Sequence, residues 1–234
     1  MTFAPRLKRL RRSLADSAGT IVFGMEDGTV SIFGLIFGVA ATTSNAGTVL
    51  IAGASGAVAA AVSMMAGVFL DMETTRDETK AKRAALQSAL SADAASVRAA
   101  LPGQLTVAGL NQRQSAALTG AVMRDRDAFE GLLLALHGSP AAPPSPWEQA
   151  LWMLIADFAA AAVPILPFVF LPVAQARWVS AAVTVALLIA LGIGRGRIAG
   201  RALARTVLET VCVGIAAALA GVAISVLIER AFTG

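Results

Sequence analysis

Three side chains that could bind a cation or carry a proton lie inside long apolar runs of the sequence: Asp27, Met64 and Asp157. An ionised carboxylate in hydrocarbon costs several kcal/mol, so an acid at such a place indicates a function by default. Two kinds of chemistry suit it, which are ligation of a cation and proton uptake by a buried carboxyl group. A thioether beside carboxylates favours a softer first-row divalent ion over Mg²⁺ or Ca²⁺.

The spacing of these residues predicts that they meet at one depth in a membrane. With a helical rise of 1.5 Å per residue, Asp27 and Asp157 each lie roughly 12 Å from the cytosolic end of their runs, and Met64 roughly 9 Å. Met65 lies beside Met64. Glu26 is about 100° around the helix from Asp27, a position more typical of a helix or subunit contact. The full set of candidate metal ligands is Asp27, Met64, Asp157, Met65 and Glu26, and Glu26 is included because it is adjacent to Asp27.

Each of the main candidates also has a purely structural interpretation. Asp27 could pair with an arginine or a backbone amide, and Asp157 could face a water-filled crevice without binding an ion. Met64 and Met65 could fill gaps between helices, which is the commoner role of methionine in a core.

The elements that must position these residues are membrane spans. Charged residues make up 15% of the chain and apolar residues 56%, whereas a soluble domain carries about 25% charged residues. Five runs could cover a bilayer of about 30 Å, which takes roughly 20 helical residues. We predict an all-α polytopic membrane protein with five transmembrane helices and a small helical cytosolic loop domain; the spans are 19–41, 46–70, 149–172, 178–194 and 206–228.

Composition excludes several other classes of protein. The single cysteine, Cys212, excludes a disulfide scaffold. With His137 as the one histidine, it also excludes the usual four-ligand zinc sites. The net charge of +4 could suggest nucleic acid. However, the charges cluster between uncharged runs, as in a membrane protein, so we expect a lipid bilayer and no nucleic acid as partner.

The basic residues predict the orientation of the chain. Of the 19 Lys and Arg residues, 17 lie before the first run, between the second and third, or between the fourth and fifth. By the positive-inside rule the N-terminus is cytosolic and the C-terminus lies on the non-cytosolic side. The expected organisation is a basic cytosolic N-terminus, two spans, a cytosolic helical loop and three further spans, at residues 1–18, 19–71, 72–146 and 147–234.

Glycine and proline predict the connections. A tight turn at Thr42–Asn45 should make the first two spans antiparallel neighbours. In the loop, a helix over 77–100 should end at Leu101-Pro102-Gly103. A second stretch over 111–137 should break near Arg124-Asp125, and a stiff proline-rich linker should follow at 139–146.

Small residues in the first span predict close helix contacts. They follow the spacing Gly24-x-x-x-Gly28 and Gly34-x-x-x-Gly38, which lets helices approach within a bundle or across a dimer. We expect Gly34 and Gly38 to lie where the first spans of two subunits pack. In the third span, Pro164 and Pro167 should bend the helix.

The motifs resemble those of the vacuolar iron transporter family. The resemblance rests on Asp27-Gly28-x-Val30-Ser31 in the first span, Ser63-Met64-x-Ala66-Gly67 in the second and Pro164-Ile-Leu-Pro-Phe168 in the third. It implies a homodimer of five-span subunits that carries Fe²⁺, and often Mn²⁺, out of the cytosol in exchange for protons. A transporter of this kind is not an enzyme, and the metal is its cargo rather than a cofactor.

The chain departs from the family pattern at several acids. Gly56 stands where the better-known members have a metal-binding glutamate, and Gly67-Val68-Phe69 replaces a common Gly-Glu-Tyr. Glutamates are sparse in the loop, which is often Glu-rich and metal-collecting in the family. Of the family's membrane ligands only Asp27 and Met64 carry over. Asp157 is not a family feature, and we infer from its depth alone that it could be a substitute acid. The alternatives to metal export are a non-transporting membrane scaffold or regulator and an exporter of another solute.

Overall fold

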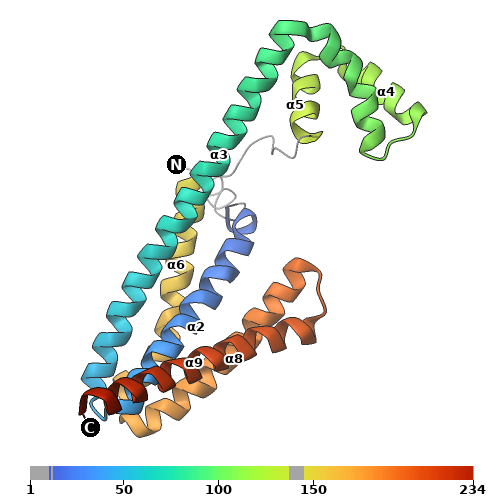
Figure 1. The fold of residues 1–234 in the computed structure, drawn as a ribbon. Coiled ribbons are helices and arrows are strands. Elements are labelled where there is room, and N and C mark those ends of the chain that lie inside the picture. The colour runs from blue at the N-terminus through green and yellow to red at the C-terminus, as the bar shows by residue number, and fades with distance from the viewer. Residues whose placement is uncertain (1–10, 12, 137–144, 234) are drawn as a thin grey trace, which may run out of the picture. The chain divides into compact units, whose positions relative to one another are not determined.

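The computed structural model describes residues 11, 13–136 and 145–233, and this part of the chain contains helices and no strand (Figure 1). It forms two compact units, Met1–Phe69 with Pro146–Gly234, and Leu70–Ser145. Five helices are long and apolar enough to cross a membrane, which confirms the predicted all-α polytopic fold. They are α2 (Ala18–Thr42), the first part of α3 (Ala46–Val107), α6 (Pro146–Ile165), α8 (Val173–Ala199) and α9 (Leu203–Thr233).

Helix α2 is the central element of the first unit. It packs against α6, α9 and α8, and also against the first part of α3. Its buried residues Ile32 and Ile36 join Phe168 and Val173 in one apolar core. Because α2 meets a neighbour on more than one side, its two acids are positioned by several helices at once.

The predicted turn between the first two spans is present. Helix α2 ends at Thr42 and α3 begins at Ala46. A Cβ at Gly53 would lie 2.9 Å from Ile36, and one at Gly56 would lie 3.4 Å from Ile32. Because the contacts on α3 advance along the chain while those on α2 recede, the two helices are antiparallel neighbours, as predicted.

The glycines near the start of α2 make room for α6. A Cβ at Gly24 would lie 2.7 Å from the sulfur of Met153, and one at Gly28 would collide with the backbone carbonyl of Asp157. Only a residue without a side chain allows two helix backbones to approach so closely. This glycine pair therefore joins α2 to α6 within one subunit.

The second glycine pair contacts α9 of the same chain, so Gly34 and Gly38 serve a contact within the bundle, one of the two that their spacing allowed. A Cβ at Gly34 would lie 2.9 Å from the carbonyl oxygen of Ala217. One at Gly38 would lie 2.6 Å from the Gly221 oxygen and 2.7 Å from Ser225 Oγ. Both glycines are buried in the single chain. The G-x-x-x-G spacing indicates close approach but does not identify the partner helix, which here is α9.

The prolines of the third span interrupt it, as predicted. Helix α6 ends at Ile165, and a short helix, α7 (Pro167–Phe170), follows. The Ser180 hydroxyl of α8 donates a 2.7 Å hydrogen bond to the carbonyl of Pro164, which satisfies a backbone acceptor at the break. Helix α8 then begins at Val173, five residues before the predicted start, and turns into α9 at Gly200, whose φ is +63°.

The second unit folds around its own apolar core, which includes Leu101, Leu105, Phe129 and Leu133. It contains the last part of α3, α4 (Gln112–Val122) and α5 (Arg126–Leu136). The predicted break near Arg124-Asp125 is confirmed. His137 and most of the proline-rich linker, residues 139–144, lie outside the described residues.

The predicted helix end at Leu101-Pro102-Gly103 was wrong. The backbone instead leaves the helical region at Asp93, with φ −151° and ψ 81°. The Asp93 carboxylate accepts a 2.9 Å hydrogen bond from the backbone N–H of Ser96, as an N-cap does for the turn that follows. The helix then continues through Pro102 to Val107. The Pro102 carbonyl accepts hydrogen bonds from the hydroxyls of Thr106 and Ser115, and the second of these ties α4 to α3.

Candidate functional site

Asp27 and Asp157 come from different helices and are brought together by Gly28. A Cβ at Gly28 would lie 3.0 Å from Asp157 Oδ1, in addition to its collision with the Asp157 backbone. Asp27 directly precedes Gly28 on α2, so the two acids lie where the backbones of α2 and α6 meet. The predicted convergence of these two acids at one depth is therefore what the structure shows.

The Asp157 carboxyl group is buried without a partner. Its residue is 0% exposed, and neither carboxylate oxygen has a hydrogen bond within the described part of the chain. Buried polar groups in proteins are almost always hydrogen-bonded. An unpaired charge at low dielectric is strongly unfavourable, so this carboxyl group needs a proton or a cation.

Asp27, unlike Asp157, lies at a cavity. It is half-buried and lines a cavity of about 170 Å³ together with Glu26 of α2, Arg195 of α8 and Thr210 of α9. A water molecule occupies about 30 Å³ in the liquid, so the cavity has room for a cation that keeps some of its water ligands. Asp27 can therefore meet a mobile ion, whereas Asp157 lies against the backbone of α2.

Glu26 is engaged by two other helices. Thr210 Oγ1 donates a 2.8 Å hydrogen bond to Glu26 Oε1. The Arg195 guanidinium lies 3.6 Å from Glu26 Oε2. The two acids that are adjacent in sequence thus have different surroundings, and the placement of Glu26 at a helix contact agrees with the interpretation drawn from its position around the helix.

Met64 and Met65 share the level of Asp27 on α3. Both are half-buried. Continuing the antiparallel register set by Gly53 and Gly56 brings Met64 to within about one helical turn of Asp27 along the bundle. This register brings the two residues to about the level of Asp27, and no contact between either sulfur and an acid is described.

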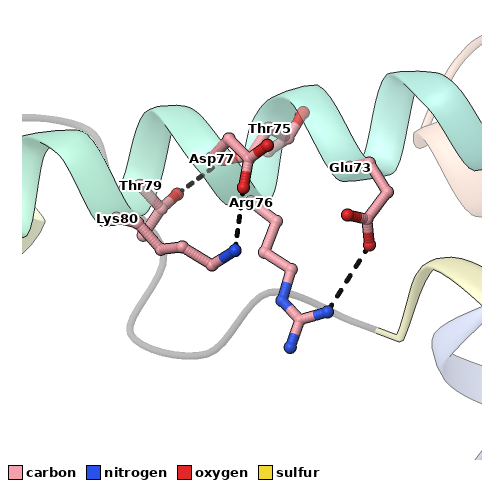
Figure 2. A network of polar contacts seen from close by, with 6 residues as sticks. All are labelled: Glu73, Thr75, Arg76, Asp77, Thr79 and Lys80. Atoms are coloured by element: carbon pink, nitrogen blue, oxygen red, sulfur yellow. Dashed lines mark hydrogen bonds and ion pairs between the residues drawn. The ribbon is translucent and has the colours of Figure 1, made fainter.

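Two acids of the second unit, Glu73 and Asp77, are paired with basic residues on the same helix. Figure 2 shows Asp77 accepting a 2.8 Å hydrogen bond from Lys80, and Arg76 lying 3.4 Å from Glu73. The hydrogen bond from Lys80 holds the pKa of the Asp77 carboxyl below its usual range. Within the described residues no group of three or more His, Cys, Asp or Glu side chains is placed to hold a metal ion.

Most of the chain matches a known protein family. Residues 18–226 match the model of the VIT family. The chain belongs to the VIT family. This membership indicates a metal-ion transporter rather than a classical enzyme, and together with the five apolar helices it indicates a membrane protein. No curated protein matches the chain.

Two residues that line this cavity were not among the predicted site residues. Arg195 and Thr210 line the cavity beside Glu26, but neither belongs to a motif. The sequence does indicate that a basic partner such as Arg195 should exist, because Glu26 lies in an apolar run and an acid inside a membrane is usually paired. Which basic residue supplies it depends on the rotation of α8 against α2, and hydropathy does not determine that rotation.

Proposed function

We propose that this VIT-family protein moves divalent transition-metal ions, with Fe²⁺ and Mn²⁺ as first candidates, out of the cytosol in exchange for protons. The observation that carries the proposal is the pairing of Asp27 and Asp157 at Gly28. One acid of the pair reaches a cavity and the other is sealed against α2. Such an arrangement suits an ion that is bound during part of a cycle and released later.

The pair links metal binding to protons through charge. Two ionised carboxylates held close together repel each other, and the repulsion is relieved by a divalent cation or by protons. Metal binding to carboxyl groups therefore releases protons, and protonation favours metal release. This linkage supports exchange of protons for metal at one site without a separate proton path.

Met64 supports the choice of a softer metal. A thioether ligand favours later first-row ions over Mg²⁺ and Ca²⁺, which prefer oxygen shells. Met64 lies at the level of Asp27 along α3, as the register of the Gly53 and Gly56 contacts indicates. We assign Asp27 as the principal ligand, Met64 as the soft ligand and Asp157 as the second acid.

The working unit in this proposal is a homodimer in the lipid bilayer, as the family resemblance implies. With Gly34 and Gly38 covered by α9, the remaining exposed positions on α2 include Phe23, Ser31 and Leu35. A Ser31→Cys variant in a Cys212→Ser background should form a disulfide-linked dimer in membranes under mild oxidation. An exclusively monomeric product, with Leu35→Cys equally monomeric, would show that α2 does not face a second copy.

The deciding experiment is metal uptake into proteoliposomes that contain the purified protein and an internal pH indicator. Fe²⁺, Mn²⁺, Co²⁺ and Zn²⁺ are compared at equal concentration, with Asp27→Asn liposomes as the matched control. We expect metal-dependent flux together with an internal pH change. Protein that is folded and inserted but moves none of the four ions would contradict the proposal.

One observation favours the alternative of a membrane scaffold or regulator. The acids of the second unit that Figure 2 shows are occupied by Lys80 and Arg76, which does not suit collection of metal ions in the cytosol. The same uptake experiment separates the two functions, because a scaffold gives no flux with any ion.

A further inference from the structure

Two neighbouring cavities share a wall in the first unit. The inner one, of about 170 Å³, contains Asp27. The outer one, of about 270 Å³, reaches Gly19 in the first turn of α2 and Ala199 at the end of α8. Three residues line both cavities: Phe23, Glu26 and Arg195. These three residues, here called the partition, therefore lie between the cavity that contains Asp27 and the cavity that reaches the ends of α2 and α8.

The two halves of this ion pair are held differently. Glu26 is fixed by the hydrogen bond from Thr210 at 2.8 Å, and its side chain is 15% exposed. The Arg195 side chain is 41% exposed, and its Nη1 lies 3.6 Å from Glu26 Oε2, beyond a normal hydrogen-bond length. Arginine also has a long and flexible stem. Glu26 is therefore the anchored partner and Arg195 the one that can move aside.

We propose that Arg195 is a specificity-determining residue for transport: it is a tethered cation that an incoming divalent ion displaces from Glu26 on the way to Asp27. The inference rests on the proposed metal transport. At a given distance a divalent ion is attracted to Glu26 twice as strongly as a monovalent one. Na⁺ and K⁺ gain too little to displace a guanidinium that carries the same charge and is already in place. The ion pair therefore favours divalent cations before they reach Asp27.

The first test measures transport by Arg195→Gln, which keeps a polar side chain and removes the charge. The KM for Mn²⁺ should fall by about tenfold, since an uncompensated Glu26 raises the local cation concentration. K⁺ should now inhibit uptake, while N-methylglucamine at the same ionic strength, being too bulky for the cavity, should not. Wild-type uptake should respond equally to both salts.

Two variants on the same helix act as controls. Arg195→Lys restores the charge and should restore insensitivity to K⁺. Arg197→Gln removes the same charge from an exposed position that lines neither cavity, and should behave as wild type. An unchanged KM and no specific K⁺ inhibition in Arg195→Gln, or the same changes in Arg197→Gln, would overturn the proposal.

The second test reads access to the inner cavity without transport. Val30 lines the inner cavity and Ile198 the outer one. Each is replaced by cysteine in a Cys212→Ser background, and the rate of modification by a trimethylammonium-ethyl methanethiosulfonate is measured in sealed vesicles. Adding Arg195→Gln should speed labelling of Val30→Cys severalfold and leave Ile198→Cys unchanged.

The two tests separate this inference from the proposed function. If the wild type carries no metal but Val30→Cys labelling still depends on Arg195, the transport proposal fails and the partition is supported. If metal is carried and neither KM nor labelling depends on Arg195, the partition is refuted and transport stands.

Discussion

Glu26 and Asp27 are adjacent in sequence, but the residues around them differ, and we expect the two acids to have different roles. Each Glu26 oxygen faces a partner, Thr210 or Arg195. Asp27 lines the cavity one residue further on. We therefore expect removal of the Glu26 charge to change access and apparent affinity, and removal of the Asp27 charge to abolish ion binding.

Asp27→Asn should reduce metal uptake to the background of empty liposomes. The substitution keeps the shape of the side chain but removes the charge that attracts a cation and the group that takes up a proton. Expression and chromatographic behaviour should be unchanged. Glu26→Gln is the matched control, because its amide can still accept the hydrogen bond from Thr210 and uptake should persist. Normal uptake by Asp27→Asn would refute its role as a ligand.

Asp157→Asn separates a functional acid from a structural one. If Asp157 supports the ion, uptake should fall by about tenfold or more, the range seen when groups that support a metal site are removed. Because the carboxyl group has no described partner, its replacement by a neutral amide should leave the melting temperature unchanged or raise it. A large loss of thermal stability with normal uptake would make Asp157 a packing residue.

At the residue scale the sequence predicted depth well and side-chain pairing less well. Depth follows from the constant rise of a helix, so Asp27 and Asp157 could be placed at one level. The Glu26–Arg195 contact depends on how α8 is rotated about its axis, and many rotations have nearly the same hydropathy. The buried environment of Asp157 is likewise a property of α2, whose Gly28 seals it.

Helix α2 uses its glycines on two sides. Gly24 and Gly28 face α6, and Gly34 and Gly38 face α9. The sequence predicted close approach but gave no partner, since G-x-x-x-G spacing is the same whether the second helix belongs to the same subunit or another one. The structure assigns both pairs to contacts within the chain.

Gly28→Ala should destabilise the bundle by about 1–3 kcal/mol, the usual cost of overpacking. The added methyl group would collide with the Asp157 carbonyl, which belongs to a rigid backbone. Gly194→Ala is the matched control, because a Cβ there meets nothing within 4 Å, and it should be neutral or stabilising by about 0.5–1 kcal/mol. Thermal unfolding in detergent compares the two, and equal stability would show that α2 and α6 can separate freely.

In α3 the proline does not mark the end of a helix, whereas an aspartate marks the interruption. Pro102 was expected to end a helix, yet the helix continues through it, and the non-helical residue is Asp93. A proline costs one backbone hydrogen bond, which tertiary contacts can offset. Leu101 and Leu105 on either side are fully buried in the core of the second unit, and this packing keeps the segment helical.

At the scale of the whole molecule, the five spans follow from hydropathy because a backbone in lipid must satisfy its own hydrogen bonds. Helix boundaries were predicted less accurately, and α8 extends beyond its predicted span at both ends to include Arg177, Arg195 and Arg197. Arginines near helix ends can reach the interface, so they do not stop a helix as a hydropathy window suggests.

The second unit should bind metal weakly. Its acids are scattered among Lys and Arg residues, and the local positive charge opposes cation capture. Full-length protein with Asp27→Asn and Asp157→Asn should therefore show no submillimolar Fe²⁺ or Zn²⁺ binding by calorimetry. Tight binding with a stoichiometry of one or more per chain would restore a metal-collecting role for this unit.

The acids of α2 and α6 have a consequence for biosynthesis. These two helices have the lowest mean hydropathy of the five, 1.4 and 1.3, against 2.7 for α9. A charged residue at the centre of a span opposes release from the translocon into lipid by about 2.5–3.5 kcal/mol. The two helices that hold Asp27 and Asp157 are therefore the least able to enter the bilayer alone.

Isolated segments tested with glycosylation reporters should show this directly. Leu203–Phe232 should insert completely, Pro146–Ile165 only in part, and Asp157→Leu should raise insertion of the latter. Complete insertion of unmodified Pro146–Ile165 would contradict the idea. In the growing chain, α6 emerges more than 100 residues after α2. During that interval α2 lacks α6, the helix that packs against its glycines. A chaperone that binds unpaired membrane spans should therefore raise the yield of folded protein.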